Sequence, residues 1–303
     1  MPSYAVTGAS RGIGFGFIQA LALKKENVVF AIIRNAATAA QLYELAKTHS
    51  NVHIVIGDAT KPEDMARAAS EVGAITGGKL DVLINNVGGG VAEDAKAPED
   101  LISNPTEFKN ALISSLDLNL FSGFYAMNSF LPLIRAGSVK KIIFISTGMA
   151  DEYLTLKSEI PFAALYGASK SALNMMVAKC AVQFKAEGIM FLSLSPGWVA
   201  TQSGKFPPSA FSYLGIAKSL VVLVDESKVD EKEMLENGAN DGIAQEEEMN
   251  VKMFLPAFNK VYPDLKEKTT VEDSIRMQLE TIANLTLERS GEFVSHHGDK
   301  NWV

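Results

Sequence analysis

The sequence predicts an α/β fold in which helices cover both faces of a doubly wound, parallel sheet. Two observations support this prediction. Short runs of β-branched residues alternate with longer helical stretches from residue 3 to about 195, and such alternation implies parallel pairing through right-handed crossovers. Polar and glycine-rich motifs follow several of the strands, which is where ligands bind on sheets of this kind.

The expected elements alternate along the chain. The strands are Ser3–Thr7, Val28–Ile33, Val52–Ile56, Leu80–Asn85, Lys141–Ser146 and Met190–Ser195. The helices between them are Ile13–Lys25, Ala36–Thr48, Pro62–Ile75, Thr106–Arg135 and Phe162–Lys185. Near the C-terminus, Val271–Leu285 is expected to be a further helix and Gly291–Ser295 a seventh, edge strand. We therefore expect one domain over residues 1–303 with a seven-stranded sheet.

Composition and charge describe an ordinary globular chain. Its 303 residues are 47% apolar, enough to bury a sizeable core, and its net charge is −7. The stretch Asp225–Glu248 holds ten acidic residues and two lysines, and is most simply a solvated loop or helix face. Because the remainder is nearly neutral, we expect no nucleic-acid partner. No apolar run approaches the ~18 residues of a membrane span, so no membrane partner is expected either.

Cysteine and histidine usage limits the chemistry further. The one cysteine, Cys180, excludes an internal disulfide and a cysteine-based metal site, and it fits a reducing compartment. The N-terminus has no basic segment followed by an apolar one, so we expect no signal peptide and a cytoplasmic location. The histidines show no spacing with carboxylates that indicates a metal, and we interpret His296 and His297 as a polar tail. No metal site is expected.

A glycine-rich turn, Thr7-Gly8-Ala-Ser-Arg11-Gly12-Ile-Gly14, connects the first strand to the first helix. Glycines permit a tight turn that a pyrophosphate can approach, and the N-terminus of the helix offers unpaired N–H groups and a partial positive charge. The spacing differs from the Gly-x-Gly-x-x-Gly of many dinucleotide folds. Its place between a strand and a helix nevertheless predicts a dinucleotide site.

The end of the second strand favours NADPH over NADH. About 20 residues beyond the glycines, an acidic side chain usually binds the ribose 2′-hydroxyl, whereas an arginine accommodates a 2′-phosphate. Position 34 is Arg34, no acidic residue lies between Ile32 and Ala37, and Arg11 is a second cation near the same place. The alternative is that both arginines are ordinary surface residues.

Polar residues also follow the third and fourth strands. Asp58 is suited to accept a hydrogen bond from an adenine amino group or, alternatively, to cap the next helix. The cluster Asn85-Asn86-Val87-Gly88-Gly89-Gly90 lies on the same edge, which favours contact with a ligand over a plain loop. Asn119 lies in an otherwise apolar helix, where its amide is either satisfied by backbone groups or part of a polar site.

The segment Tyr166-Gly-Ala-Ser-Lys170 carries the predicted chemistry. On a helix, residues four apart stand on one face, so the hydroxyl and the ammonium point into one cleft. A free tyrosine has a pKa of about 10, and a fixed cation beside it favours the phenolate, which lowers the pKa toward neutrality. This spacing occurs by chance on many helices, so its weight comes from the motifs around it.

Together the motifs resemble the short-chain dehydrogenase/reductase family, whose fold is of the Rossmann type. The similarity covers residues 3–201 and resumes at about residues 271–294. Within the family, the chain is most similar to fungal-type ketoreductases of secondary metabolism. The motifs that carry the resemblance are the glycine turn, Asp58, Asn85-Asn86-x-Gly88, Asn119, the hydroxyls after the fifth strand, Tyr166-x-x-x-Lys170 and Pro196–Thr201.

The resemblance implies a role for each motif. Tyr166 exchanges a proton with the carbonyl oxygen while hydride moves to or from the nicotinamide, and Lys170 lowers the tyrosine pKa and holds the nicotinamide ribose. Asn119 anchors a water that links Lys170 to solvent. The residues implied in binding NADPH or NADP are Gly8, Ser10, Arg11, Gly12, Ile13, Gly14, Arg34, Asp58, Ala59, Asn86, Gly88, Tyr166, Lys170, Pro196, Gly197, Val199 and Thr201.

Two departures from the family pattern concern the substrate pocket. Family members mostly have two serines after the fifth strand, whereas this chain has Ser146-Thr147. Thr147 occupies the position of the second serine and is therefore expected to polarise the substrate oxygen. Ser146, on the other side of the strand, is the alternative. The interval of 19 residues from Thr147 to Tyr166 is longer than usual, so we expect Asp151–Pro161 to be an extended loop at the pocket mouth.

A long segment at about residues 202–270 stands where shorter family members have a small substrate loop. It is apolar at its start, acidic in its middle and apolar again over Met253–Tyr262. We expect two amphipathic helices joined by a mobile acidic loop, which close over the substrate as a lid. The alternative is an added packing element that does not contact the substrate.

The sequence therefore predicts an NADPH-dependent ketoreductase that acts on a carbonyl or secondary alcohol of a fairly large apolar or aromatic substrate. A non-catalytic dinucleotide sensor is one alternative, and it would not need Tyr166. A non-redox biosynthetic enzyme on the same fold is another, and both alternatives predict NADPH binding without net consumption. Because family members commonly pair through the helices of Asn119 and Tyr166, the resemblance also implies a homodimer or homotetramer.

Overall fold

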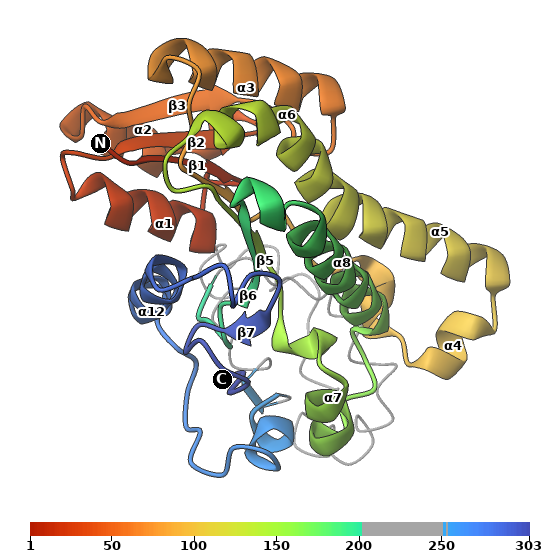
Figure 1. The fold of residues 1–303 in the computed structure, drawn as a ribbon. Coiled ribbons are helices and arrows are strands. Elements are labelled where there is room, and N and C mark those ends of the chain that lie inside the picture. Colours follow the sequence, from red (N-terminus) through yellow and green to blue (C-terminus); the bar gives the residue numbers. More distant parts are fainter. Residues whose placement is uncertain (202–250, 253) are drawn as a thin grey trace, which may run out of the picture.

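The computed structural model describes residues 1–201, 251–252 and 254–303, and it has a parallel sheet at its centre (Figure 1). The sheet has seven strands in the order β3-β2-β1-β4-β5-β6-β7. Its order changes direction between β1 and β4, the switch point at which ligands bind on such sheets. The strands are β1 (Ser3–Thr7), β2 (Val28–Ile33), β3 (Val52–Ile56), β4 (Val82–Asn85), β5 (Lys141–Ile145), β6 (Met190–Ser195) and β7 (Phe293–Ser295).

The predicted fold class is confirmed, and most strand bounds agree with the prediction to within two residues. All neighbouring strands pair in parallel, with Val6 opposite Ala31 and Ile84 opposite Ile143. The central strands are apolar runs because both of their faces are covered, so neither face needs polar side chains. β2, for example, is Val-Val-Phe-Ala-Ile-Ile, and its last five residues are buried.

Helices cover the two faces of the sheet in separate layers (Figure 1). On one face lie α1 (Gly12–Ala22), α2 (Ala40–Thr48) and α12 (Val271–Ala283), which bury residues such as Phe17, Leu42 and Ile275 against the sheet. On the other face lie α3 (Pro62–Thr76), α6 (Ser122–Ala136) and α8 (Ala164–Gln183), which bury Met65, Phe130 and Val177. Short 3-10 turns occur at Ala36–Thr38, Ala92–Ala95, Gly148–Ala150 and Lys185–Glu187.

The long helix predicted over Thr106–Arg135 is interrupted in its middle. α4 (Pro98–Ile102) precedes α5 (Pro105–Leu116), and a π-helical turn over Asp117–Phe121 joins α5 to α6. Such turns occur often at functional sites. Here the turn contains Asn119, whose side-chain amide bonds to the backbone of Gly89 outside the helix. The interruption therefore places a polar side chain beside the loop that follows β4.

The prediction of an extended loop over Asp151–Pro161 is wrong, because most of the segment is the helix α7 (Glu152–Ser158). The Asp151 carboxylate accepts a hydrogen bond from the Leu154 amide at 2.9 Å and so caps the first turn. The side chain of Leu154 is buried at 2% exposure, which gives the short helix an apolar anchor. α7 thus places Leu154 in the apolar cluster against which Tyr166 packs, rather than forming an open loop.

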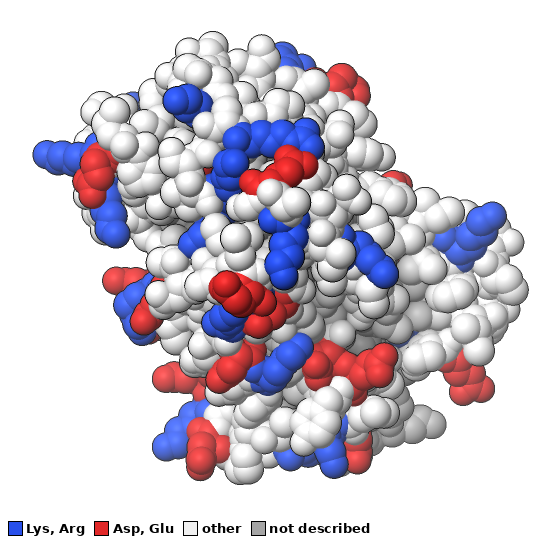
Figure 2. Space-filling view, viewed as in Figure 1, with Lys and Arg blue, Asp and Glu red and all other residues white. Residues whose placement is uncertain are grey.

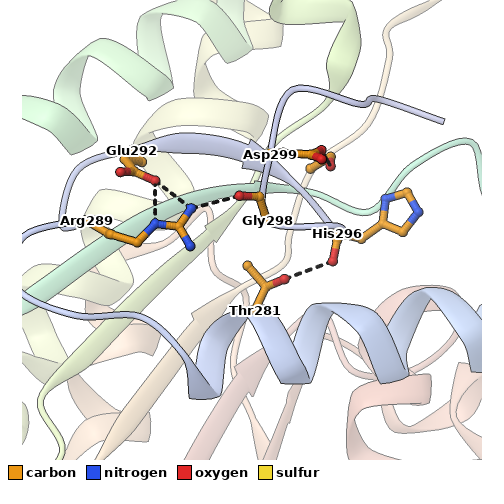
Figure 3. Close-up of polar contacts among 7 residues, drawn as sticks. Thr281, Arg289, Glu292, His296, Gly298 and Asp299 are labelled. Atoms are coloured by element: carbon orange, nitrogen blue, oxygen red, sulfur yellow. Dashed lines mark hydrogen bonds and ion pairs between the residues drawn. The ribbon is translucent and has the colours of Figure 1, made fainter.

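The polar tail expected at His296 and His297 is also wrong in part, since His296 is 1% exposed. Thr281 on α12 donates a hydrogen bond to the His296 carbonyl oxygen at 2.8 Å, and Arg289 donates to the Gly298 carbonyl oxygen at 2.8 Å (Figure 3). These contacts hold the turn after β7. The imidazole lies against Gly197, where a Cβ atom would be 2.4 Å from the His296 Cε1 atom.

The surface carries both signs of charge. On the face in Figure 2, lysine and arginine side chains are interspersed with aspartate and glutamate side chains, and neither sign forms a continuous patch. In the described ranges, no helix is both long enough and apolar enough to cross a membrane. Some apolar side chains are exposed, among them Ile113 on α5 and Met175 on α8. The homo-oligomer stays a prediction.

The buried His296 predicts how the stability of the fold depends on pH. Burial, with a smaller contribution from the neighbouring His297, lowers the pKa of His296 to about 4, while the nearby Asp299 opposes this shift. The unfolded histidine takes up a proton below pH ~6.5 and the folded one does so only below about 4, so stability present above pH ~6.5 is lost as the pH falls.

We expect the free energy of unfolding to fall by about 2 kcal/mol between pH ~7.5 and pH ~5 through this group. Urea unfolding at the two pH values measures the change, with His296→Gln expected to flatten it. The exposed His297 supplies the control, and His297→Gln should retain most of the pH dependence. An equal pH dependence in wild type and His296→Gln would contradict the assignment.

Candidate active site

The turn between β1 and α1 fits a dinucleotide pyrophosphate. No side chain caps the N-terminus of α1, and its first turn holds no acidic residue, so its N–H groups face outward with the partial positive charge of the helix. The Asn86 side chain donates hydrogen bonds to the carbonyl oxygens of Thr7 at 3.2 Å and Gly8 at 3.1 Å, which fixes the turn. A Cβ at Gly14 would lie 2.3 Å from the Gly8 carbonyl oxygen, so a side chain there would fill the turn.

The residues predicted to contact the adenosine half lie around the carboxyl ends of β1, β2 and β3. Arg11 and Arg34 are exposed, and Arg34 directly follows β2. Asp58 accepts hydrogen bonds from the backbone and the side chain of Thr60 at 3.0 and 2.8 Å. The alternative that Asp58 caps the next helix is wrong, because α3 begins at Pro62 and Lys61 occupies its cap position.

Lys170 is buried at the carboxyl end of the sheet, with 2% of its surface exposed. Its ammonium donates a hydrogen bond to the carbonyl oxygen of Ile145, the last residue of β5, at 2.8 Å. A Cβ at Gly88 would lie 2.7 Å from the ammonium nitrogen and 2.8 Å from the Asn119 Oδ1 atom, so the three residues meet at one point. Burial lowers the pKa of Lys170 to about 7.

Both interpretations of Asn119 apply, because its amide is satisfied by backbone groups and also belongs to a polar site. The residue is 2% exposed and lies beside Lys170. Its Oδ1 atom accepts from the Gly89 amide at 2.9 Å, and its Nδ2 atom donates to the Gly89 carbonyl oxygen at 2.9 Å. This two-point contact fixes the loop after β4 against the π-helical turn. The same loop contains Asn86 and Gly88, so Asn119 connects the dinucleotide turn to the lysine.

Tyr166 stands on the first turn of α8, and its side chain lines the same cavity as Thr147. Burial raises the pKa of Tyr166 to about 12; the Thr147 side chain lowers it and the charge of Asp94 raises it further. The expectation that Lys170 lowers this pKa is therefore wrong for the chain alone. Lys170 donates instead to Ile145, and with a pKa near 7 it carries only part of a charge at neutrality.

The two hydroxyls after β5 point to different places. Ser146 is buried, and its hydroxyl donates to the Asn174 Oδ1 atom on α8 at 2.7 Å. Thr147 instead lines the cavity in front of Tyr166, and its Oγ1 atom also accepts from the Met149 amide at 3.2 Å. Of the two candidates, Thr147 is the one that lines the cavity together with Tyr166.

A cavity of about 210 Å³ opens in front of Tyr166 and Thr147. Gly197, Val199 and Thr201 of the loop after β6 border it, while the Pro196 carbonyl oxygen accepts a hydrogen bond from Ser274 of α12 at 2.7 Å. The remaining lining is mostly aromatic or aliphatic. Its side chains include Met149, Leu154, Trp198, Phe254, Phe258 and Trp302.

Comparison with known proteins identifies the family. A family model described as short chain dehydrogenase matches residues 3–207. This chain belongs to the short-chain dehydrogenase/reductase family. The short-chain dehydrogenase/reductase atnB of Arthrinium sp is 36% identical and the short chain dehydrogenase virK of Hypocrea virens is 33% identical, each with 100% of both chains covered. NADPH bound carbonyl reductase from chicken fatty liver has the same fold, with a TM-score of 0.68, 24% identity, and 99% and 98% of the two chains covered.

Membership of the short-chain dehydrogenase/reductase family confirms the resemblance drawn from the motifs. It makes the chain an oxidoreductase of a class that uses nicotinamide cofactors. The two full-length relatives are fungal members of the family, as the resemblance predicted. The matched region contains the glycine turn, Asn119, Tyr166 and Lys170, which the fold brings to one edge of the sheet.

Several residues of this site have no motif that identifies them in the sequence. Phe254 and Phe258 lie in a helical stretch over residues 254–259, which belongs to the expected lid. Residues 202–250 and 253 of that expected lid lie outside the described residues. Trp302 comes from the C-terminal segment, where it stacks on Phe293 with ring centroids 4.4 Å apart. Only the apolar character of residues 253–262 gave a signal, and the contribution of Trp302 depends on long-range packing.

Asp94 is a further residue that the sequence did not single out. It is fully buried, and its carboxylate accepts hydrogen bonds from the backbone amides of Val91 and Tyr166, each at 2.8 Å. Its own carbonyl oxygen accepts from the Ala163 amide at 2.7 Å. Burial raises the pKa of Asp94, against the effect of these hydrogen bonds. Asp94 thus ties the start of α8, and with it Tyr166, to the loop after β4.

We expect Asp94→Ala to lower the free energy of unfolding by roughly 1–3 kcal/mol, because two partly buried backbone amides lose their acceptor. The change should also lower kcat/KM, since the first turn of α8 positions Tyr166. Urea unfolding and steady-state kinetics measure the two effects. Asp100→Ala, at an exposed aspartate of α4, is the matched control, and equal stability of the two variants would show that Asp94 does not anchor the helix.

Proposed function

We propose that this chain is an NADPH-dependent carbonyl reductase that acts on a fairly large aromatic or apolar ketone. The observation that carries the proposal is the position of Tyr166, which lines an aromatic cavity together with Thr147 and lies on the same helix as the buried Lys170. A sensor that only binds a dinucleotide does not need Tyr166. The aromatic lining supports a substrate with at least one ring.

The residues of the chain divide the work at the substrate oxygen. With its pKa near 12, Tyr166 is protonated at neutral pH and so is a proton donor to a carbonyl oxygen in the cavity. Thr147 offers a second hydroxyl at the same place, which favours negative charge on that oxygen. The nicotinamide, when bound, supplies the hydride for the carbonyl carbon.

Lys170 has hydrogen-bond donors available for a ligand. An ammonium has three N–H groups, and within the described chain the Ile145 carbonyl oxygen is its one hydrogen-bond acceptor. Ribose hydroxyls are suitable acceptors for the others, and a bound acceptor would favour the charged form of the lysine and thereby raise its pKa. A charged Lys170 would in turn favour proton release by Tyr166.

The catalytic proposal is tested by NADPH oxidation against a panel of aromatic and polycyclic ketones. We expect turnover by the wild type and a loss of roughly 10²–10⁴-fold in kcat for Tyr166→Phe, because the proton donor is removed. Tyr153→Phe is the control, since Tyr153 is 64% exposed on α7. Tight NADPH binding without oxidation of NADPH by any ketone would contradict the proposal and favour a sensor or a non-redox enzyme.

The preference for NADPH is proposed from Arg34 and Arg11, which are exposed near the carboxyl ends of β2 and β1. In the structure of the chicken carbonyl reductase, the bound cofactor is NADPH, which supports the same choice. Arginine suits a 2′-phosphate because its planar guanidinium donates two parallel hydrogen bonds.

We expect Arg34→Asp to lower the ratio of kcat/KM with NADPH to kcat/KM with NADH by about tenfold or more, since a charged hydrogen bond is lost and a repulsive charge is introduced. Lys109→Asp, on the exposed side of α5, is a control that makes the same change in net charge. A ratio that is the same in both variants would exclude Arg34 from cofactor choice.

A further inference from the structure

One cation stands among the apolar side chains of the cavity. Of the described residues that line it, Lys268 alone has a charged side chain, and no carboxylate side chain is among them. The neighbouring side chains include Trp198, Phe254, Phe258 and Trp302. Apolar neighbours remove part of the hydration of a cation, which strengthens its attraction for an anion beside it.

The backbone fixes the position of Lys268 relative to the loop after β6. The amide of Thr269 donates a hydrogen bond to the Trp198 carbonyl oxygen at 2.9 Å, and the amide of Ala200 donates to the Thr269 carbonyl oxygen at 2.9 Å. Val199 and Thr269 form a parallel bridge. Lys268 therefore directly precedes Thr269, the residue that pairs with Val199 of the cavity wall. The Lys268 ammonium lies 5.7 Å from the centre of the Trp198 ring.

The ammonium of Lys268 has no acidic partner within residues 1–201, 251–252 and 254–303. Other lysines on nearby elements do have one. Lys260 pairs with Glu159 at 2.5 Å, and Lys96 pairs with Glu107 at 2.5 Å. Among the described residues, the charge that faces the cavity therefore has an aromatic neighbour but no acidic partner, and a ligand with an anionic oxygen would supply one.

We propose that Lys268 selects aromatic carbonyl substrates that carry an anionic oxygen, either a ring carboxylate or an ionised phenol. This inference rests on the proposed function, because it takes the cavity in front of Tyr166 as the substrate site. The rings pack among Trp198, Phe258 and Trp302, and the anionic oxygen pairs with the Lys268 ammonium. A charged hydrogen bond of this kind discriminates strongly against a neutral analogue of the same shape.

The chain supplies its own reporter for this test. It has two tryptophans, Trp198 and Trp302, and both line the cavity, so their fluorescence reports on its occupancy. The full-length protein, saturated with NADP, would be titrated with 6-acetyl-2-naphthoate and with its methyl ester. A second pair, 6-acetyl-2-naphthol and its methyl ether, would be compared at a pH at which the phenol is ionised. The first pair tests a carboxylate and the second a phenolate.

We expect the wild type to bind at least one of the two anions about tenfold or more tightly than its neutral partner. Lys268→Gln should abolish this preference while leaving the affinity for the neutral probes unchanged, and Lys268→Arg should restore it. Lys266→Gln, at an exposed lysine of the same segment, is the matched control and should keep the preference.

Three results would overturn the proposal. They are equal affinity for the members of both pairs in the wild type, an equal loss for anion and neutral probe in Lys268→Gln, and no fluorescence change with any probe. The second result would mean that Lys268 only supports the Trp198 ring. Because binding is measured without turnover, a preference for the anion together with absent NADPH oxidation would leave this inference standing while the proposed reductase activity failed.

Discussion

The burial of one lysine ammonium is the constraint to which the rest of the site is fitted. Lys170 lies at the carboxyl end of the sheet, and within the described residues it has one hydrogen-bond acceptor, the carbonyl oxygen of Ile145. That carbonyl is available because β5 ends there. Lys141, which is also buried, shows the contrast, since it donates to the carbonyl oxygens of Ile282 and Ala283 at the end of α12. Lys141 holds two elements together, whereas Lys170 keeps donors for a ligand.

Buried polar contacts fix the elements around Lys170 from several sides. Asn119 ties the π-helical turn to Gly89, and Asp94 ties the start of α8 to the loop after β4. Between them, the Ser115 hydroxyl lies 3.1 Å from the Ser169 hydroxyl on α8. Each contact crosses from one element to another, so none of the elements can shift alone. This rigidity is what holds a proton donor and a desolvated lysine at one place.

The environments of Tyr166 and Lys170 shift the pKa values of the two groups in opposite directions. Burial raises the pKa of the tyrosine to about 12 and lowers that of the lysine to about 7, so both neutral forms are favoured in the chain alone. Pairing of a cation with a phenolate therefore awaits a ligand that supplies hydrogen bonds to the lysine. In this respect, the sequence spacing of four residues identified the pair but not its charge state.

Local sequence patterns predicted the features that depend on neighbouring residues in the chain. The strand bounds follow from β-branched apolar runs, and the glycine turn, Asn119 and the Tyr166–Lys170 pair were found because each motif has a fixed place after a strand or on a helix. His296, Asp94 and Trp302 were missed because their roles come from residues far away in the chain. His296 meets Gly197, and Asp94 meets Tyr166. The helix α7 was missed although its cap, Asp151, was readable, because a long interval was interpreted as a loop.

The proposed reaction moves a hydride between a nicotinamide and a carbonyl carbon held before Tyr166. It can be followed with NADPH that carries deuterium at C4, on one face of the ring and then on the other, and with a ketone that binds in the cavity. We expect deuterium from one face alone to appear at the carbinol carbon of the product, as detected by mass spectrometry. Unlabelled product with both forms of the cofactor, while NADPH stays bound and unchanged, would contradict it.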